Sequence, residues 1–114
     1  MNILITGASG FIGSRLVKKL KKLKIFKIYL VSSKKRRNFI KLDLLNPNYN
    51  QIKKLKIEVC IHLAWAKIPD YSKQNSFQNY QASKKLFNFL LSHGCKKIIS
   101  VGSCWEYKED YGRK

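Results

Sequence analysis

Three glycines near the amino terminus follow a short apolar run and are separated by two residues each. They are Gly7, Gly10 and Gly13 in the stretch 6–13, Thr-Gly-Ala-Ser-Gly-Phe-Ile-Gly. A tight turn at Gly7 favours a residue without a Cβ, Gly10 lets the backbone approach a pyrophosphate, and Gly13 lets a helix pack near the preceding strand. The first amides and the positive dipole end of such a helix attract phosphate. The spacing predicts dinucleotide binding, with a purely structural turn as the alternative.

The elements that such a loop needs are present around it. Residues 2–6 are predicted to form a buried strand, and 11–24 a helix with Ile12, Leu16, Leu20 and Leu23 in one apolar stripe. Residues 27–31 are apolar on both faces of a second strand, which is typical of a parallel sheet covered on both sides.

Further elements follow in a regular alternation. Strands are expected at 39–42, 58–63 and 97–101. A helix is expected from 46 to about 56, with Asn46 as N-cap and Pro47 in its first turn. A longer helix is expected at 77–92, with Phe77, Tyr80, Phe87, Leu90 and Leu91 as its apolar residues and Gly94 after its end. This order predicts one α/β domain over 1–114, a Rossmann-type doubly wound parallel sheet of strand order 3-2-1-4-5.

Composition narrows the functional classes. The 24 Lys and Arg residues outnumber six Asp and Glu, and the formal net charge is +18. Such an excess attracts nucleic acid or anionic membranes at low salt, but the lysines are spread over the whole chain, as a compositional bias of the genome would produce. We therefore expect no specific nucleic-acid partner. We expect no signal peptide, since the apolar start lacks a basic segment before it and runs into polar residues. The sequence has no apolar run of membrane-spanning length, and its three cysteines lack a paired or metal-binding spacing. We expect a cytoplasmic protein with reduced thiols and without a metal site.

With these elements in place, the stretch 6–13 resembles the opening of the short-chain dehydrogenase/reductase superfamily. It is most similar to the extended branch, the NAD(P)-dependent epimerases, dehydratases and reductases of nucleotide sugars. The resemblance implies that NAD or NADP is bound through the loop and the start of its helix. The residues concerned are Gly7, Ser9, Gly10, Phe11, Ile12 and Gly13.

Two later stretches agree with the family in order and spacing. Residues 41–44, Lys-Leu-Asp-Leu, resemble the end of the family's third strand, which implies that Asp43 hydrogen-bonds the adenine with Leu44 beside it. Taken alone, Asp43 reads as a turn or cap residue. Residues 60–66, Cys-Ile-His-Leu-Ala-Trp-Ala, resemble the fourth-strand motif. There the resemblance implies a structural His62, and a backbone at Leu63, Ala64 and Ala66 that passes the nicotinamide ribose.

A further match concerns the catalytic end of the sheet. Residues 100–107, Ser-Val-Gly-Ser-Cys-Trp-Glu-Tyr, resemble the end of the family's fifth strand, and Ser103 occupies the position of its catalytic Ser or Thr. Asn79 matches a buried Asn of the helix before that strand, and we count it among the cofactor-site residues.

The end of the second strand bears on the choice of nucleotide. A site that prefers NAD carries an acid about 20 residues past the loop, to bind the ribose 2′-hydroxyl. Here the sequence from residue 32 is Ser-Ser-Lys-Lys-Arg-Arg, without an acid. Hydroxyl donors of Ser32 and Ser33 and the guanidinium of Arg36 would instead hold a 2′-phosphate. The sequence favours NADP over NAD.

The family's chemistry needs a Tyr that transfers a proton and a Lys four residues later that lowers the pKa of that Tyr. Tyr80 and Lys84 have this spacing, but they precede the fifth strand, whereas the family's pair follows it. Tyr49 and Lys53 match as well, and a chain so rich in Lys produces such matches by chance. We expect neither pair to be catalytic.

No such pair follows Ser103 in this sequence, because Tyr107 is followed four residues later by Tyr111. We therefore expect the amino-terminal half of an enzyme that is inactive alone and has an incompletely covered sheet of marginal stability. The intact enzyme would bind a nucleotide sugar and could form a homodimer. The alternative is a non-catalytic NAD(P)-binding sensor or regulatory module.

Overall fold

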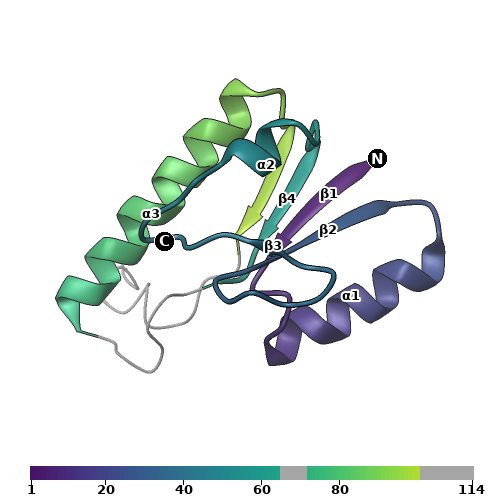
Figure 1. Ribbon diagram of the computed structural model, residues 1–114, viewed down its shortest axis with the longest axis horizontal. Coiled ribbons are helices and arrows are strands. Elements are labelled where there is room, and N and C mark those ends of the chain that lie inside the picture. Colours follow the sequence, from purple (N-terminus) through teal and green to yellow (C-terminus); the bar gives the residue numbers. More distant parts are fainter. Residues whose placement is uncertain (65–71, 101–114) are drawn as a thin grey trace, which may run out of the picture.

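The computed structural model describes residues 1–64 and 72–100 (Figure 1). Its centre is a sheet of five strands in the order β3-β2-β1-β4-β5, and every pairing between neighbours is parallel. The strands are β1 (Asn2–Thr6), β2 (Lys27–Ser32), β3 (Ile40–Lys41), β4 (Val59–His62) and β5 (Lys97–Ser100). This confirms the predicted Rossmann-type order. Thr6 is in register with Val31 on one side and His62 on the other, so the carboxyl ends of the three central strands meet at one edge.

Helices cover both faces of this sheet. Figure 1 shows α1 (Phe11–Leu23) on one side and α2 (Asn50–Lys53) and α3 (Lys73–Ser92) on the other. Successive residues of β1 therefore enter two different cores, since side chains alternate across a strand. Ile3 and Ile5 pack with Val17 of α1, whereas Leu4 packs with Leu86 of α3.

The helix expected at 46–56 is much shorter, and its predicted N-cap is wrong. The α2 helix spans only Asn50–Lys53, and Tyr49 is its N-cap, without a side-chain cap. Asp43 Oδ1 accepts a hydrogen bond from the Leu45 amide, and Asn48 Oδ1 accepts one from the Asn50 amide, both at 3.1 Å. These local bonds favour the non-helical path of residues 43–49, because short Asp and Asn side chains compete with helical hydrogen bonding.

The long helix α3 begins four residues earlier than expected. Ser72 is its N-cap, and its Oγ accepts a hydrogen bond from the Asn75 amide at 3.2 Å. The polar first turn gave no apolar periodicity from which to place this start. At the other end, Gly94 has φ +94° directly after the C-cap residue His93, as expected.

The buried face of α3 coincides only in part with the apolar residues predicted for it. Phe77, Tyr80 and Leu91 are 57%, 60% and 54% exposed. The buried positions are Asn75, Asn79, Ala82, Leu86 and Leu90. The predicted stripe of α1 is likewise only partly buried, because Ile12 and Leu23 are exposed while Gly13 and Val17 face the sheet.

Candidate functional site

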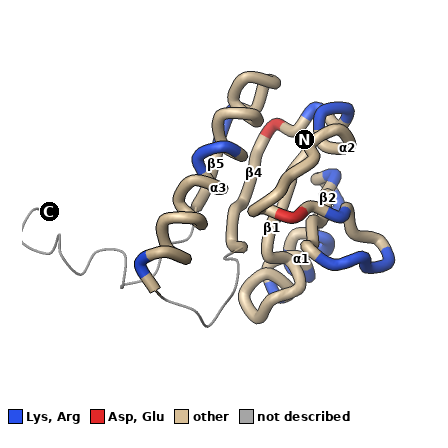
Figure 2. The backbone as a smooth tube through the Cα atoms, turned by 60° about the vertical axis from the view of Figure 1, so that its left-hand side comes forward, with Lys and Arg blue, Asp and Glu red and all other residues tan. Residues whose placement is uncertain are grey.

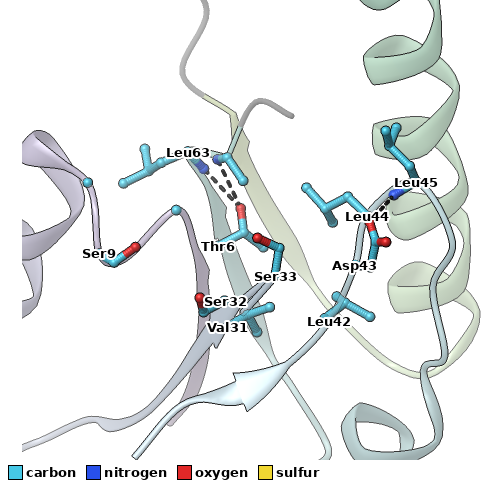
Figure 3. Close-up of a pocket in the computed structure, with 13 residues that line it drawn as sticks. Thr6, Ser9, Val31, Ser32, Ser33, Leu42, Asp43, Leu44, Leu45 and Leu63 are labelled. Carbon is cyan, nitrogen blue, oxygen red and sulfur yellow. Dashed lines mark hydrogen bonds between the residues drawn. The ribbon is translucent and has the colours of Figure 1, made fainter. Parts of the chain in front are cut away.

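A cavity of about 560 Å³ opens at the carboxyl ends of β1, β2, β3 and β4 (Figure 3). It lies where the strand order reverses between β1 and β4, the position at which open α/β sheets bind their ligands. The residues that line it are Thr6, Gly7, Ser9, Gly10, Val31, Ser32, Ser33, Leu42, Asp43, Leu44, Leu45, Leu63 and Ala64.

Gly7 and Gly13 are required by the packing of the loop itself. Gly7 has φ +69°, and a Cβ there would lie 2.8 Å from the Ala64 nitrogen and the Leu63 carbonyl carbon. A Cβ on Gly13 would overlap the Gly7 carbonyl oxygen and lie 2.8 Å from the Ala8 Cα. These contacts bring the turn against the end of β4 and bring α1 against the turn.

Gly10 has no comparable structural reason to lack a side chain. Its φ of −78° is accessible to any residue, and a Cβ would meet only the Gly7 carbonyl oxygen, at 3.4 Å. Gly10 lines the cavity and is the N-cap of α1, where no side chain caps the helix. The next three amides, those of Phe11, Ile12 and Gly13, have no acceptor within the helix. The loop is therefore suited to binding an anion that approaches the backbone closely.

The Thr6 side chain joins the end of β1 to the end of β4 through three hydrogen bonds. Its Oγ1 accepts from the Leu63 and Ala64 amides at 3.1 and 3.2 Å (Figure 3). Since both lone pairs of the hydroxyl are then used, its proton is donated to His62 Nδ1, 2.6 Å away. The ring proton of His62 consequently resides on Nε2, which donates to Ser83 Oγ at 2.9 Å.

His62 itself is only 4% exposed and does not line the cavity. Burial lowers the pKa of His62 to about 4, so the ring is neutral at pH 7. In this state it links β1, β4 and α3 in one buried network. The wall formed by Leu63 and Ala64 is thereby fixed beside Gly7.

The opposite wall comes from the ends of β2 and β3 (Figure 3). Ser32 Oγ accepts a hydrogen bond from the Lys34 amide at 3.2 Å, and Ser33 is exposed at the cavity. Asp43 is also exposed there, with Oδ1 bonded to the Leu45 amide. Asp43 thus has the contacts of a turn residue as well as a place at the cavity.

The cavity brings together nine of the cofactor-site residues predicted from the sequence: Gly7, Ser9, Gly10, Ser32, Ser33, Asp43, Leu44, Leu63 and Ala64. The predicted Phe11, Ile12, Gly13, Arg36 and Asn79 are not in its lining. Asn79 is buried on α3, where its Nδ2 donates to the Asn75 carbonyl at 3.0 Å. Ala66 and Ser103 lie outside the described residues.

Four lining residues were not predicted as site residues: Thr6, Val31, Leu42 and Leu45. Each is a direct neighbour of a predicted one. The signal that could have found them is the end of each predicted parallel strand, because all these ends share one edge of the sheet.

The Tyr-Lys pairs lie away from this cavity. Tyr80 is exposed on α3 and stacks near Phe77, with 6.5 Å between ring centroids. Tyr49 stacks on Phe89 at 4.5 Å, and burial raises its pKa. Neither tyrosine lines the cavity.

Residues 1–64 and 72–100 contain neither a metal-binding cluster nor a membrane-spanning helix. This part of the chain holds no group of three or more His, Cys, Asp or Glu residues that could bind a metal ion. No helix in these ranges is long and apolar enough to cross a membrane.

Several solved structures share this fold. The ADP-L-glycero-D-manno-heptose-6-epimerase of Helicobacter pylori superposes with a TM-score of 0.79 at 23% identity, over 94% of this chain and 40% of that one. The UDP-glucuronic acid 4-epimerase of Bacillus cereus, in complex with NAD, superposes with a TM-score of 0.72 at 27% identity, over 96% of this chain and 42% of that one. This chain therefore spans well under half the length of either epimerase.

Comparison of the sequence with protein families identifies the chain more specifically than the shared fold does. No curated protein matches the chain significantly. The sequence model of the NAD dependent epimerase/dehydratase family matches residues 3–113, nearly the whole sequence. The match includes the glycine loop and every strand whose end contributes to the cavity. The chain therefore belongs to the NAD-dependent epimerase/dehydratase family.

Proposed function

We propose that this chain is the dinucleotide-binding domain of an NAD(P)-dependent epimerase, dehydratase or reductase that acts on a nucleotide sugar. The observation that carries the proposal is the cavity at the glycine turn. Gly10 has no side chain that would keep a ligand from the backbone there, and it begins α1 without a side-chain cap. The Bacillus cereus epimerase, 27% identical, was solved with NAD, which supports the same ligand class here.

Each wall of the cavity has a proposed task. Gly10 and the amides that follow it would bind the pyrophosphate. Asp43 and Leu44 would contact the adenine, and Leu63, Ala64 and Ala66 would pass the nicotinamide ribose. The hydrogen bonds from Thr6 to the Leu63 and Ala64 amides support a preformed wall on this side.

NADP is the proposed dinucleotide. Ser32 and Ser33 line the cavity at the end of β2, and no acid lies there to bind a free 2′-hydroxyl or to repel a 2′-phosphate. The charge of the 33–37 segment, with two Lys and two Arg, supports the same preference.

Catalysis would involve Ser103 as the residue that orients the substrate oxygen. The sequence contains no Tyr-x-x-x-Lys after Ser103, so we propose that this chain alone does not turn over a sugar. The same observation favours the second candidate, a non-catalytic NAD(P)-binding sensor or regulatory module. Reading the coding sequence beyond Lys114 in all frames separates the two candidates. If an enzyme has been interrupted, we expect a Tyr-x-x-x-Lys about 20 to 40 residues past Ser103, because the helix after strand five would follow in that interval.

We also propose a homodimer that uses α3. The exposed Phe77, Tyr80 and Leu91 on this helix support it, since large exposed apolar side chains on one element favour association. Sedimentation equilibrium of the chain and of its Phe77→Ser variant tests this, with dissociation expected in the variant.

A thermal-shift titration tests the dinucleotide proposal. NADP or NAD at millimolar concentration is expected to raise the melting temperature, because ligand binding to the native state stabilises it. Gly10→Val is expected to remove the shift, whereas Lys97→Ala, an exposed change at the amino end of β5, is expected to retain it. No shift with either dinucleotide would overturn the proposal.

A further inference from the structure

Lys41 lies beside the residue that is expected to face the adenosine ribose. The β2–β3 register pairs Ser32 with Lys41, and the Leu42 amide donates to the Ser32 carbonyl at 2.8 Å. Partners in register on parallel strands project to the same face of a sheet. Ser32 occupies the end of β2, where a family member that prefers NAD would carry its acid. Lys41 is thus the nearest neighbour of that position on β3.

A second cavity, of about 550 Å³, continues from the first around β3. The two share Ser33, Leu42 and Asp43, and Lys41 lines the second. Its other lining residues carry amide side chains: Asn46, Asn48, Asn50 and Gln51. Lys41 is the only cation in this lining, and Ser33 and the amide groups add neutral hydrogen-bond donors. The shared residues show that the two cavities adjoin at the ends of β2 and β3.

The lining of this space holds one cation, Lys41, and one acid, Asp43. Asp43 and Glu58 are the only acids among the described residues, and the two short red segments in Figure 2 lie apart from each other. Glu58 precedes β4, where it accepts from the Asn2 amide at 3.1 Å, so it lies at the opposite end of the strands. The Asp43 carboxylate is at the cavity, but its Oδ1 is engaged by the Leu45 amide. Lys41 offsets its charge within the lining, and the four cations of the 34–37 segment lie in the β2–β3 loop that follows Ser33.

Arg36, the cation expected from the sequence, is in a different position. Neither cavity includes it in its lining, and its carbonyl accepts from the Phe39 amide at 3.2 Å within the β2–β3 loop. Lys41 is instead the cation beside these serines, because the strand register pairs it with Ser32 and the second cavity is lined by both Lys41 and Ser33.

We propose that Lys41 binds the 2′-phosphate of NADP in the second cavity and is the residue that selects NADP over NAD. An ammonium group suits a phosphate as a compact point charge, and Ser33 supplies a hydroxyl donor beside it. This inference rests on the proposed dinucleotide function. It assigns the selecting cation to the edge strand β3 instead of the loop after β2.

The test is a fluorescence titration of NADPH and NADH against the full chain and three charge-matched variants: Lys41→Gln, Arg36→Gln and Lys97→Gln. Loss of a charge-assisted contact is expected to weaken NADPH binding to Lys41→Gln by about tenfold, with NADH binding unchanged. Lys97→Gln, which removes the same charge at the other end of the sheet, is expected to change neither affinity. Lys41→Arg is expected to restore the preference for NADPH.

Three results would overturn the assignment while leaving the proposed function standing. The first is that Lys41→Gln and Lys97→Gln bind NADPH with the same affinity. The second is that Lys41→Gln loses as much affinity for NADH as for NADPH. The third is that only Arg36→Gln loses the preference for NADPH. Failure of the unsubstituted chain to bind either dinucleotide would instead overturn the proposed function, and the assignment with it. The midpoint of urea unfolding, measured for each variant, shows whether the exposed Lys41 side chain can be replaced without loss of the fold.

Discussion

The glycines of the loop have separable roles, and alanine substitutions at Gly10 and Gly13 distinguish them. At Gly13 the new Cβ would overlap the Gly7 carbonyl oxygen and crowd the Ala8 Cα, so backbone must move. Overpacking of this kind costs about 3 kcal/mol, and replacing a helical Gly by Ala returns about 1 kcal/mol. We expect Gly13→Ala to lower the free energy of unfolding by about 2 kcal/mol.

At Gly10 the expectation is the reverse, with a small effect on stability and a large one on binding. The new Cβ would be 3.4 Å from the nearest atom, the Gly7 carbonyl oxygen, at an unstrained φ of −78°. Loss of a favourable N-cap residue costs at most about 1 kcal/mol. A methyl group at the surface that a pyrophosphate approaches is expected to weaken dinucleotide binding by about tenfold or more, as overpacking at a contact does.

Urea unfolding and fluorescence titration with NADPH measure the two effects in the same preparations. The reasoning is refuted by a Gly10→Ala variant that binds NADPH as tightly as the unsubstituted chain. It is also refuted by a Gly13→Ala variant that unfolds at the unsubstituted midpoint. Both outcomes would mean that the turn adjusts to side chains more readily than its contacts indicate.

Three further predictions concern two buried residues of β4, His62 and Cys60, and the exposed Tyr80 of α3. Burial lowers the pKa of His62 from 6.5 to about 4, so the unfolded chain binds a proton that the native chain does not between these values. The contribution of His62 to the free energy of unfolding is therefore fully present above pH 6.5, and it falls by roughly 3 kcal/mol as the pH decreases to 4. Urea unfolding at a series of pH values should show this decrease, and the His62→Gln variant should show a smaller one. Burial of the thiol, and to a smaller extent the neighbouring Cys95, raises the pKa of Cys60 to about 12. Iodoacetamide at pH 8 should therefore leave Cys60 unmodified until the chain unfolds, which peptide mass mapping measures. Tyr80→Phe should leave the NADPH affinity unchanged, since Tyr80 is exposed away from the cavity; a tenfold loss would contradict its exclusion from the site.

Local patterns predicted the parts of the fold in which local and tertiary preferences agree. Residues 3–5 of the run before Gly7 are apolar at successive positions, which suits a strand with both faces covered, and β1 is central in the sheet. The glycine spacing then fixed the start of α1 at Phe11, as predicted. The strand order followed from the alternation of strands and helices, because right-handed crossovers leave few arrangements.

The differences arose where distant partners decide the structure. Short Asx hydrogen bonds at Asp43 and Asn48 replaced most of the predicted second helix. The buried face of α3 carries Asn75 and Asn79 instead of Phe77 and Tyr80, and the partly buried Ser83 beside it meets His62 of β4. Periodicity in one segment contains no information about such a partner.

The candidate site shows the same division. Residues in the glycine turn that were predicted to bind the cofactor, such as Ser9, line the cavity. Lys41 was not considered, because its relevance depends on the β2–β3 register, which pairs it with Ser32. Arg36 was favoured by charge and by proximity in sequence to Ser33, but neighbours in a loop need not face the same cavity.

A ¹⁵N–¹H correlation spectrum recorded during titration with NADP tests the central claim most directly. Dinucleotide binding in the cavity predicts shift changes at the amides of Gly7, Gly10, Ser33 and Ala64, with Glu58 and Lys97 at the opposite ends of the strands unchanged. A spectrum that does not change at millimolar NADP or NAD, or changes that map to the amino ends of the strands, would contradict it.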